Sequence, residues 1–107
     1  MNNQNVSSSF GIPNNDLNAI LSVITKFEKI EKVVLFGSRA KGNYKKGSDI
    51  DLALFSKKLS FKELLKIKVD VNNLPLPYII DILHFQQITN FELKEHIDRI
   101  GIVLYQK

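Results

Sequence analysis

The stretch that decides the fold of this chain is Phe36–Leu54, which reads FGSRAKGNYKKGSDIDLAL. An apolar run leads into Gly37, a basic loop with several glycines follows, and a second apolar run begins near Asp49. Residues two apart in a strand share one face of a sheet and lie about 6.5 Å apart. We therefore expect Asp49 and Asp51 to point to the same side, while Ile50, Leu52 and Leu54 point into the core.

The two aspartates and the basic loop predict a site for metal ions and phosphate. Carboxylate oxygens are the hard ligands that Mg²⁺ and Mn²⁺ prefer. The loop contributes positive charge only, from Arg39, Lys41, Lys45 and Lys46. The 107 residues include no cysteine, so a disulfide framework or cysteine-ligated zinc is excluded. Divalent ions held between carboxylates and a polyphosphate indicate nucleotide chemistry.

Each of these features can also be explained by structure alone, with no catalytic or binding role. Gly37-Ser38 alone is typical of a tight turn whose serine caps a helix, and a basic run is usually a solvated surface. Asp49 alone fits a turn, but a turn does not explain Asp51, which stands between apolar residues. Asp81 stands in the apolar run 78–83, where an unpaired carboxylate is costly, so it requires a metal ion or a partner such as Arg99.

Apolar spacing and end signals predict the other elements. Strands are predicted over residues 32–36, 49–55, 78–83 and 102–105. Helices are predicted from Asp16 to Phe27, over 38–41, from the Ser60/Glu63 capping box to before Pro75, and from Asn90 to Ile100. The second long helix is predicted to bury Leu64, Leu65, Ile67 and Val71. His84 and His96 are isolated, and each is predicted to be a structural or surface residue and not a ligand or base.

This order of elements predicts one α/β domain, a mixed β-sheet flanked by helices. We place the domain at residues 14–107 and a flexible tail, rich in Asn, Ser and Gln, at residues 1–13. No apolar run approaches the roughly 20 residues that span a bilayer, and no signal peptide is recognisable. We expect a cytoplasmic protein with no membrane contact. The net charge of +4 permits nucleic-acid binding, but its concentration beside two aspartates favours a nucleotide.

The segment 37–42, GSRAKG, followed by 48–52, SDIDL, resembles the signature of the polymerase-beta-like nucleotidyltransferase superfamily. It is most similar to the minimal nucleotidyltransferases, or MNT proteins, and the similarity runs from about Lys32 to the C-terminus. The resemblance implies a polymerase-beta-like fold in which two Mg²⁺ ions, or Mn²⁺, are bound by the catalytic carboxylates Asp49, Asp51 and Asp81. It assigns nucleotide binding to Gly37, Ser38, Arg39 and Ser48, with Ser38 donating hydrogen bonds to the triphosphate.

The resemblance also implies an activity and a partner. MNT proteins are often encoded beside a helical HEPN protein, which implies that this chain is an antitoxin that transfers AMP from ATP to a hydroxyl group, plausibly that of a tyrosine on the toxin. A hetero-oligomer is then expected, while a homo-oligomer stays open. One alternative is a non-catalytic subunit that neutralises a helical partner, and another is transfer to a small molecule or to RNA. Retention of Ser38 and three aspartates favours catalysis, because a scaffold has no need of clustered carboxylates.

Overall fold

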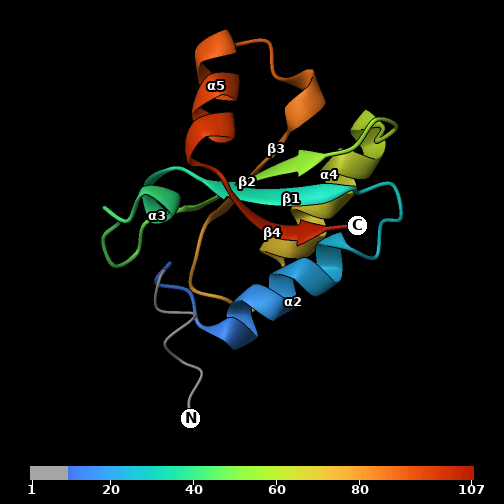
Figure 1. Cartoon of the computed structure of the whole chain (residues 1–107). Coiled ribbons are helices and arrows are strands. Elements are labelled where there is room, and N and C mark those ends of the chain that lie inside the picture. The colour runs from blue at the N-terminus through green and yellow to red at the C-terminus, as the bar shows by residue number, and fades with distance from the viewer. Residues whose placement is uncertain (1–9) are drawn as a thin grey trace.

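The computed structural model describes residues 10–107, which fold into a four-stranded sheet with helices on both faces (Figure 1). The elements are α2 (Asn14–Ile24), β1 (Lys32–Phe36), α3 (Ser38–Lys41), β2 (Ile50–Phe55), α4 (Phe61–Asn72), β3 (Ile80–His84), η1 (Phe85–Gln87), α5 (Phe91–Ile100) and β4 (Ile102–Gln106). The strand order is β3-β2-β1-β4. β1 runs antiparallel to β2 and β4, whereas β3 runs parallel to β2. The predicted mixed sheet is confirmed.

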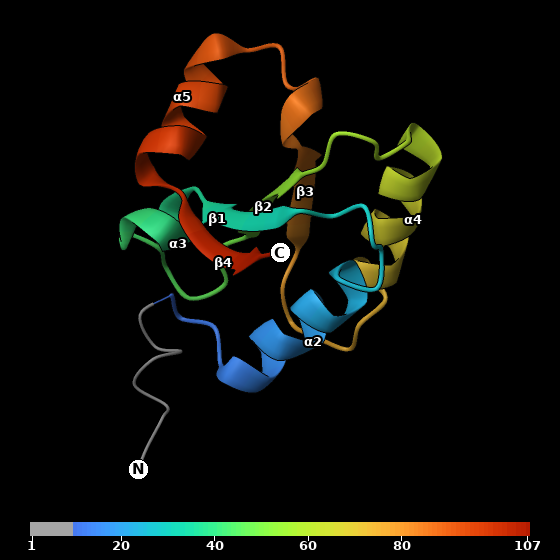
Figure 2. The same cartoon turned by 45° about the vertical axis from the view of Figure 1, so that its right-hand side comes forward.

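Alternation along β1 divides the core between the two faces of the sheet. Val33 and Leu35 are buried in the larger cluster, which α2 and α4 cover, whereas Val34 and Phe36 are buried with Ile97 of α5. Figures 1 and 2 show α2 below the sheet and α5 above it, with α4 at the side. Because successive side chains of a strand point to opposite faces, a residue's parity decides which layer it joins.

The long helices begin largely as their sequences predict. Ser60 and Glu63 form the reciprocal capping box of α4, and the side chain of Asn90 accepts the Leu93 N–H at 3.0 Å at the start of α5. α2 differs from the prediction because it begins at Asn14, directly after Pro13, with no side-chain cap. Asp16, where the sequence predicts the helix to begin, lies in the first turn of α2 and accepts a hydrogen bond from the Tyr78 hydroxyl at 3.0 Å.

The boundary of the predicted tail at residue 13 is wrong. Ile12 is fully buried in the larger cluster, and Phe10 packs against the same cluster. The Phe10 carbonyl also accepts a hydrogen bond from Arg39. The segment before α2 is mostly polar, so its composition predicts a flexible tail. The burial of Ile12 nevertheless holds this part of the segment against the domain. Residues 1–9 of the predicted tail lie outside the described residues.

Leu65 is a second difference, because it is 44% exposed although the sequence predicts it buried. Adjacent helical residues are about 100° apart around the axis, so the face that buries Leu64, Ile67 and Val71 turns Leu65 toward solvent. Together with Phe61 and Val69 it belongs to the large apolar side chains that stay exposed. α4 therefore carries more apolar surface than its packing on the sheet uses.

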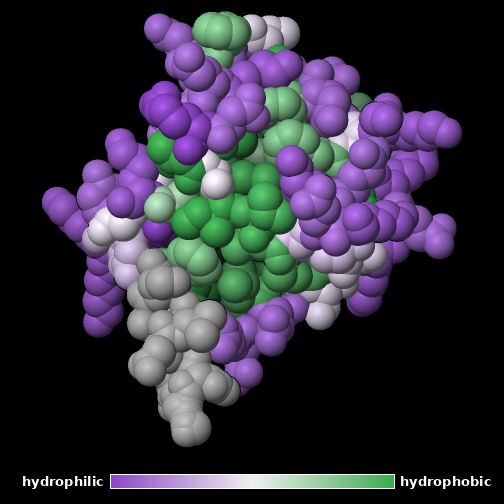
Figure 3. Space-filling view, in the orientation of Figure 1, coloured by the Kyte–Doolittle hydropathy of each residue, from purple (hydrophilic) through white to green (hydrophobic). Residues whose placement is uncertain are grey.

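The edge strand β4 carries a further apolar surface. Figure 3 shows apolar side chains gathered over β4 and toward α2, with polar residues around them. Val103 is 51% exposed, and Ile102 and Leu104 are half-buried. No helix within residues 10–107 has both the length and the apolar character needed to cross a membrane.

The burial of Ile12 yields a stability prediction. Ile12→Ala removes buried methyl groups and leaves a cavity, so we expect the free energy of unfolding to fall by about 2–5 kcal/mol. Ile79→Ala is the matched control, because Ile79 is 68% exposed and its truncation should change the value by no more than about 0.5 kcal/mol. Urea titration of both variants measures the difference. Equal effects would mean that residues 10–13 do not pack on the domain.

Candidate active site

Two of the predicted carboxylates stand side by side on the sheet. Asp51 is the second residue of β2, Asp81 is the second residue of β3, and the two are register partners in the parallel pair. Neighbouring strands lie about 4.8 Å apart, and register partners point to the same face. Asp51 shares its parity with Ala53, which packs on the α5 side. The two carboxylates therefore lie on the α5 face, away from α2 and α4.

The third predicted carboxylate adjoins this pair. Asp49 is exposed and precedes β2, which begins at Ile50, one residue later than predicted. Burial raises the pKa of Asp51, and repulsion from Asp81 and then Asp49 raises it further, while Arg39 lowers it. The three carboxylates are thus close enough to influence one another. Within residues 10–107, none of them takes part in an ion pair.

Asp81 lies in a different environment from the predicted one. It is exposed, although its neighbours Ile80 and Ile82 are buried, because nothing within residues 10–107 covers β3 on the side of Asp81. The argument that burial forces Asp81 to bind a cation is therefore wrong. The proposed alternative, pairing with Arg99, is also excluded, since Arg99 lies 3.8 Å from Glu95 instead. What favours a cation at Asp81 is its position beside Asp51.

These residues fit a divalent cation in donor type and charge. Asp49, Asp51 and Asp81 supply hard oxygen ligands and an uncompensated negative charge. They do not close a ligand set by themselves, because no three acidic, His or Cys side chains within residues 10–107 converge tightly enough to hold an ion. An ion here needs further oxygens, such as those of water or of a phosphate chain.

Gly37 allows the backbone to approach Asp51 closely. It connects β1 to α3 with φ +79° and ψ −157°, a conformation that essentially only glycine adopts. A methyl group added at Gly37 would overlap the Oδ2 atom of Asp51. Ser38 follows, half-buried at the start of α3, and its hydroxyl makes no hydrogen bond to any other residue of the 10–107 segment. Both residues thus adjoin the carboxylates with their polar groups accessible.

Arg39 and Ser48 organise the loop that precedes Asp49. The buried guanidinium of Arg39 donates from Nε (3.1 Å) and Nη2 (2.8 Å) to the Ser48 carbonyl, and from Nη1 to the Phe10 carbonyl (2.8 Å). The Ser48 hydroxyl in turn accepts the Lys45 N–H at 2.8 Å. The sequence predicts that Arg39 contacts phosphate. In the structure Arg39 is 98% buried and its guanidinium donates hydrogen bonds to carbonyls, so we infer that it positions the loop instead.

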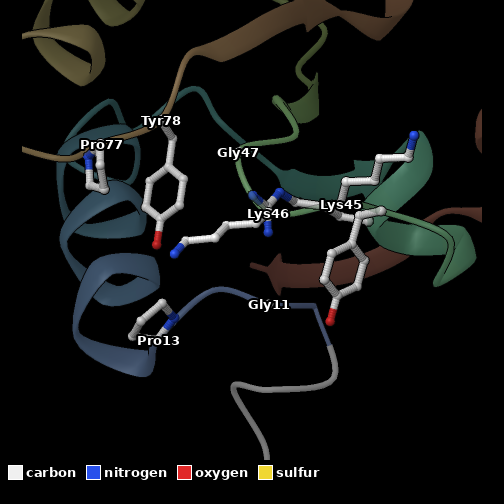
Figure 4. Close-up of a pocket in the computed structure, with 9 residues that line it drawn as sticks. Gly11, Pro13, Lys45, Lys46, Gly47, Pro77 and Tyr78 are labelled. Atoms are coloured by element: carbon white, nitrogen blue, oxygen red, sulfur yellow. The ribbon is translucent and has the colours of Figure 1, made fainter.

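The lysines of the loop face a different space. A cavity of about 340 Å³ is lined by Gly11, Pro13, Arg39, Tyr44, Lys45, Lys46, Gly47, Pro77 and Tyr78. Figure 4 shows Lys46 extending toward Tyr78 while Lys45 points away from it. The guanidinium of Arg39 lies 5.3 Å from the ring centroids of both Tyr44 and Tyr78. This cavity adjoins α2, whereas the carboxylates lie on the opposite face. Sequence reasoning did not single out Tyr78, whose only signal was an aromatic ring shortly before Asp81.

The two histidines have structural surroundings, as predicted. His84 is buried and its Nε2 lies 2.8 Å from the Ser56 carbonyl. His96 packs the edge of its ring against Phe36, with centroids 6.3 Å apart. Both contacts join segments that are distant in the sequence.

Comparison with known proteins agrees with this geometry. Residues 18–107 match the family described as Polymerase beta, Nucleotidyltransferase. This chain belongs to the polymerase beta nucleotidyltransferase family. It is therefore a nucleotidyltransferase by class, and the predicted family and fold are confirmed. It is 30% identical over 97 residues to the probable protein adenylyltransferase MntA of Haemophilus influenzae, covering 90% of this chain and 84% of that protein.

Solved structures show the same nucleotidyltransferase fold. One is a Shewanella oneidensis MNT antitoxin complex with tri-AMPylated HEPN toxin, at TM-score 0.66 and 18% identity over 87% of this chain and 71% of that one. Another is a toxin–antitoxin structure with AMP-PNP, at TM-score 0.68 and 20% identity over 87% of this chain and 73% of that one. At these identities the similarity shows the fold alone.

The environment of Gly37 predicts a specific defect. Gly37→Ala combines a disfavoured backbone conformation, which costs about 1–3 kcal/mol, with overlap on Asp51. We expect lower stability and at least about tenfold weaker binding of ATP with Mg²⁺, a loss of roughly 1.4 kcal/mol. Gly42→Ala is the control, because Gly42 also has positive φ but open space around it. Calorimetric titration of both variants measures the binding. Equal affinities would remove Gly37 from the site.

The raised pKa of Asp51 predicts a pH dependence. The folded protein binds this proton more tightly than the unfolded chain, so the contribution to stability is complete below pH 3.8 and is lost as pH rises through the raised pKa. Asp51→Asn should therefore be more stable than wild type at pH 7, and the gap should close on acidification. Asp98→Asn, at an exposed position of α5, is the control. Denaturant titrations from pH 3 to pH 8 measure the free energy of unfolding of each variant. A lower stability of Asp51→Asn than of wild type at pH 7 would contradict the prediction.

Proposed function

We propose that this chain transfers AMP from ATP to a hydroxyl group of a protein partner, in the cytoplasm, and thereby acts as the antitoxin of a HEPN toxin. The acceptor oxygen forms a bond to the α-phosphorus, the bond between the α- and β-phosphates breaks, and pyrophosphate leaves. The observation that carries the proposal is the in-register pair of Asp51 and Asp81, whose charges have no counterion within residues 10–107. Structural aspartates are normally paired or solvated singly, whereas paired carboxylates beside a glycine turn suit phosphoryl chemistry. The relationship to a probable protein adenylyltransferase supports AMP as the transferred group.

The carboxylates have distinct proposed tasks. Asp49 and Asp51 hold the magnesium-bound triphosphate against the turn at Gly37, and the Ser38 hydroxyl donates a hydrogen bond to a phosphate oxygen. Asp81 stands on the outer strand, is exposed, and faces the incoming acceptor, so it positions the acceptor hydroxyl and accepts its proton. Two bound Mg²⁺ ions would supply charge neutralisation of the phosphates and acidify the acceptor hydroxyl. Mn²⁺ has the same ligand preference.

The acceptor must come from another molecule. The described domain offers a single open face at the carboxylates and no second domain to enclose a substrate. An MNT antitoxin of the same fold is found with a tri-AMPylated HEPN toxin, which supports a HEPN protein as the acceptor here. We propose a tyrosine hydroxyl as the group that is modified. The resulting assembly is a hetero-oligomer.

A non-catalytic antitoxin is the second candidate, and the apolar surfaces of α4 and β4 favour it. These surfaces suit partner binding whether or not transfer takes place. The two functions differ in what they require of Asp81, because inhibition by binding alone does not depend on a carboxylate that accepts a proton.

Asp81→Asn separates the two candidates. We expect the variant to keep most of its affinity for ATP with Mg²⁺ but to lose transfer by a factor on the order of 100 or more, the scale of a positioned proton acceptor. Labelled ATP, Mg²⁺ and a HEPN-type protein from the same organism are incubated together to measure AMP incorporation, and chelation of the metal is the control. If the wild type labels nothing yet still suppresses the toxin, the binding function is correct. If Asp81→Asn transfers at the wild-type rate, the role of Asp81 is wrong.

A further inference from the structure

A groove runs along the outer side of β3, between α4 and the segment that leads into α5. Its cavity measures about 380 Å³. Ile82, Leu83 and His84 form its floor, and the residues on either side are Leu64 and Lys68 of α4, and Gln87, Ile88, Thr89, Asn90 and Leu93. Figure 2 shows α4 beside β3. We call this surface, together with the exposed side of α4, the α4–β3 groove.

The side of α4 next to this cavity is apolar although it faces solvent. Phe61, Leu65 and Val69 are 74%, 44% and 57% exposed. They are spaced four residues apart, so they form one continuous stripe, adjacent to Leu64 and Lys68 on the helix surface. On the opposite side of the groove, Phe91 follows Asn90 and is 75% exposed. Single exposed apolar residues are ordinary, but a stripe beside a groove marks an interaction surface.

The geometry points to a helix of a partner protein as the occupant of the α4–β3 groove, with acidic residues at its margin. This inference rests on the proposed function, because it specifies how the acceptor protein is brought to the nucleotidyltransferase. A strand is disfavoured, since the side-chain amide of Asn72 already bonds both the N–H (3.3 Å) and the carbonyl (3.1 Å) of Ile80 at the free edge of β3. An apolar stripe with four-residue spacing instead matches the ridge of another helix.

Charge specifies the partner further. Lys62 and Lys68 flank the stripe and take part in no ion pair within residues 10–107. The acidic residues of α4 are already paired, Glu63 with Lys29 at 2.9 Å and Asp70 with Lys66 at 3.1 Å. The available charge is therefore positive and attracts an acidic margin. A second copy of this chain would place lysines against lysines, which disfavours a homodimer through this surface.

The groove borders the strand that carries Asp81. Its floor residue Ile82 directly follows Asp81 but points to the other face of the sheet, and Ile79, which is 68% exposed, lies just before β3. Because β3 is the edge strand, a partner can reach both faces around this edge. A helix seated along α4 therefore lies beside the strand that carries Asp81. Docking here presents neighbouring residues of the partner to the proposed proton acceptor.

Val69→Glu and Leu65→Glu test the groove, with Val103→Glu as the matched variant. Val69 and Val103 have the same side chain and similar exposure, 57% and 51%, but Val103 lies on β4 at the opposite edge of the sheet. The probe is a purified HEPN-type protein from the same organism, and its affinity is measured by calorimetry. We expect the Kd to rise at least about tenfold for both groove variants and to stay unchanged for Val103→Glu. Unaltered binding of ATP with Mg²⁺ confirms that each variant is folded.

Lys62→Glu combined with Lys68→Glu tests the charge argument. We expect weaker binding of the same protein and a smaller dependence of its affinity on salt. AMP transfer is measured in parallel on all variants. If the partner binds and the groove variants weaken it but no AMP is transferred, docking stands and the enzymatic function falls.

Three results would overturn the docking inference. The first is absence of binding by the wild type, or binding by Leu65→Glu at the wild-type affinity. The second is loss of binding in Val103→Glu alone, which would move the interface to β4. The third is a change of oligomeric state in Leu65→Glu without the partner, which would identify a second copy as the occupant.

Discussion

Mutual repulsion of carboxylates at one end of the sheet is the constraint on which the rest of this structure depends. The pairing of β2 with β3 holds Asp51 beside Asp81, and burial and repulsion both raise the pKa of Asp51. The fold tolerates this unfavourable arrangement because the opposite face of the same strands buries Ile50, Leu52 and Ile82 under α2 and α4. Stability and chemistry are thus assigned to opposite faces of one sheet.

Arg39, a buried cation near the site, does not neutralise it. Arg39 lowers the pKa of Asp51 through space but uses its hydrogen bonds on the Ser48 and Phe10 carbonyls. A direct ion pair between Arg39 and Asp51 would have neutralised the negative charge that binds a metal ion. Arg39 instead fixes the loop before Asp49 from behind, so the carboxylates are positioned while their charge stays available. A small domain can in this way preorganise a site without closing it.

The openness of the site is consistent with the apolar surfaces found elsewhere on the molecule. Within residues 10–107 no segment covers the carboxylates, so we propose that a second protein supplies the acceptor and excludes water. The stripe on α4 adjoins the strand of Asp81, whereas β4 lies at the far edge of the sheet. The proposed partner-binding stripe and Asp81 therefore lie on either side of one strand, β3.

The sequence by itself determined the elements, the family and the paired faces, because these depend on local spacing: alternation puts Asp49 and Asp51 on one side, and the Ser60 capping box starts α4. Only the tertiary structure decided that β3 is the outer strand, which exposes Asp81, and that Arg39 turns inward to carbonyls. Leu65 and Ile12 were misjudged for the same reason. Strand order, hydrogen-bond partners and the choice of buried face all arise from contacts between distant segments, and no local pattern encodes which of several apolar residues those contacts will cover.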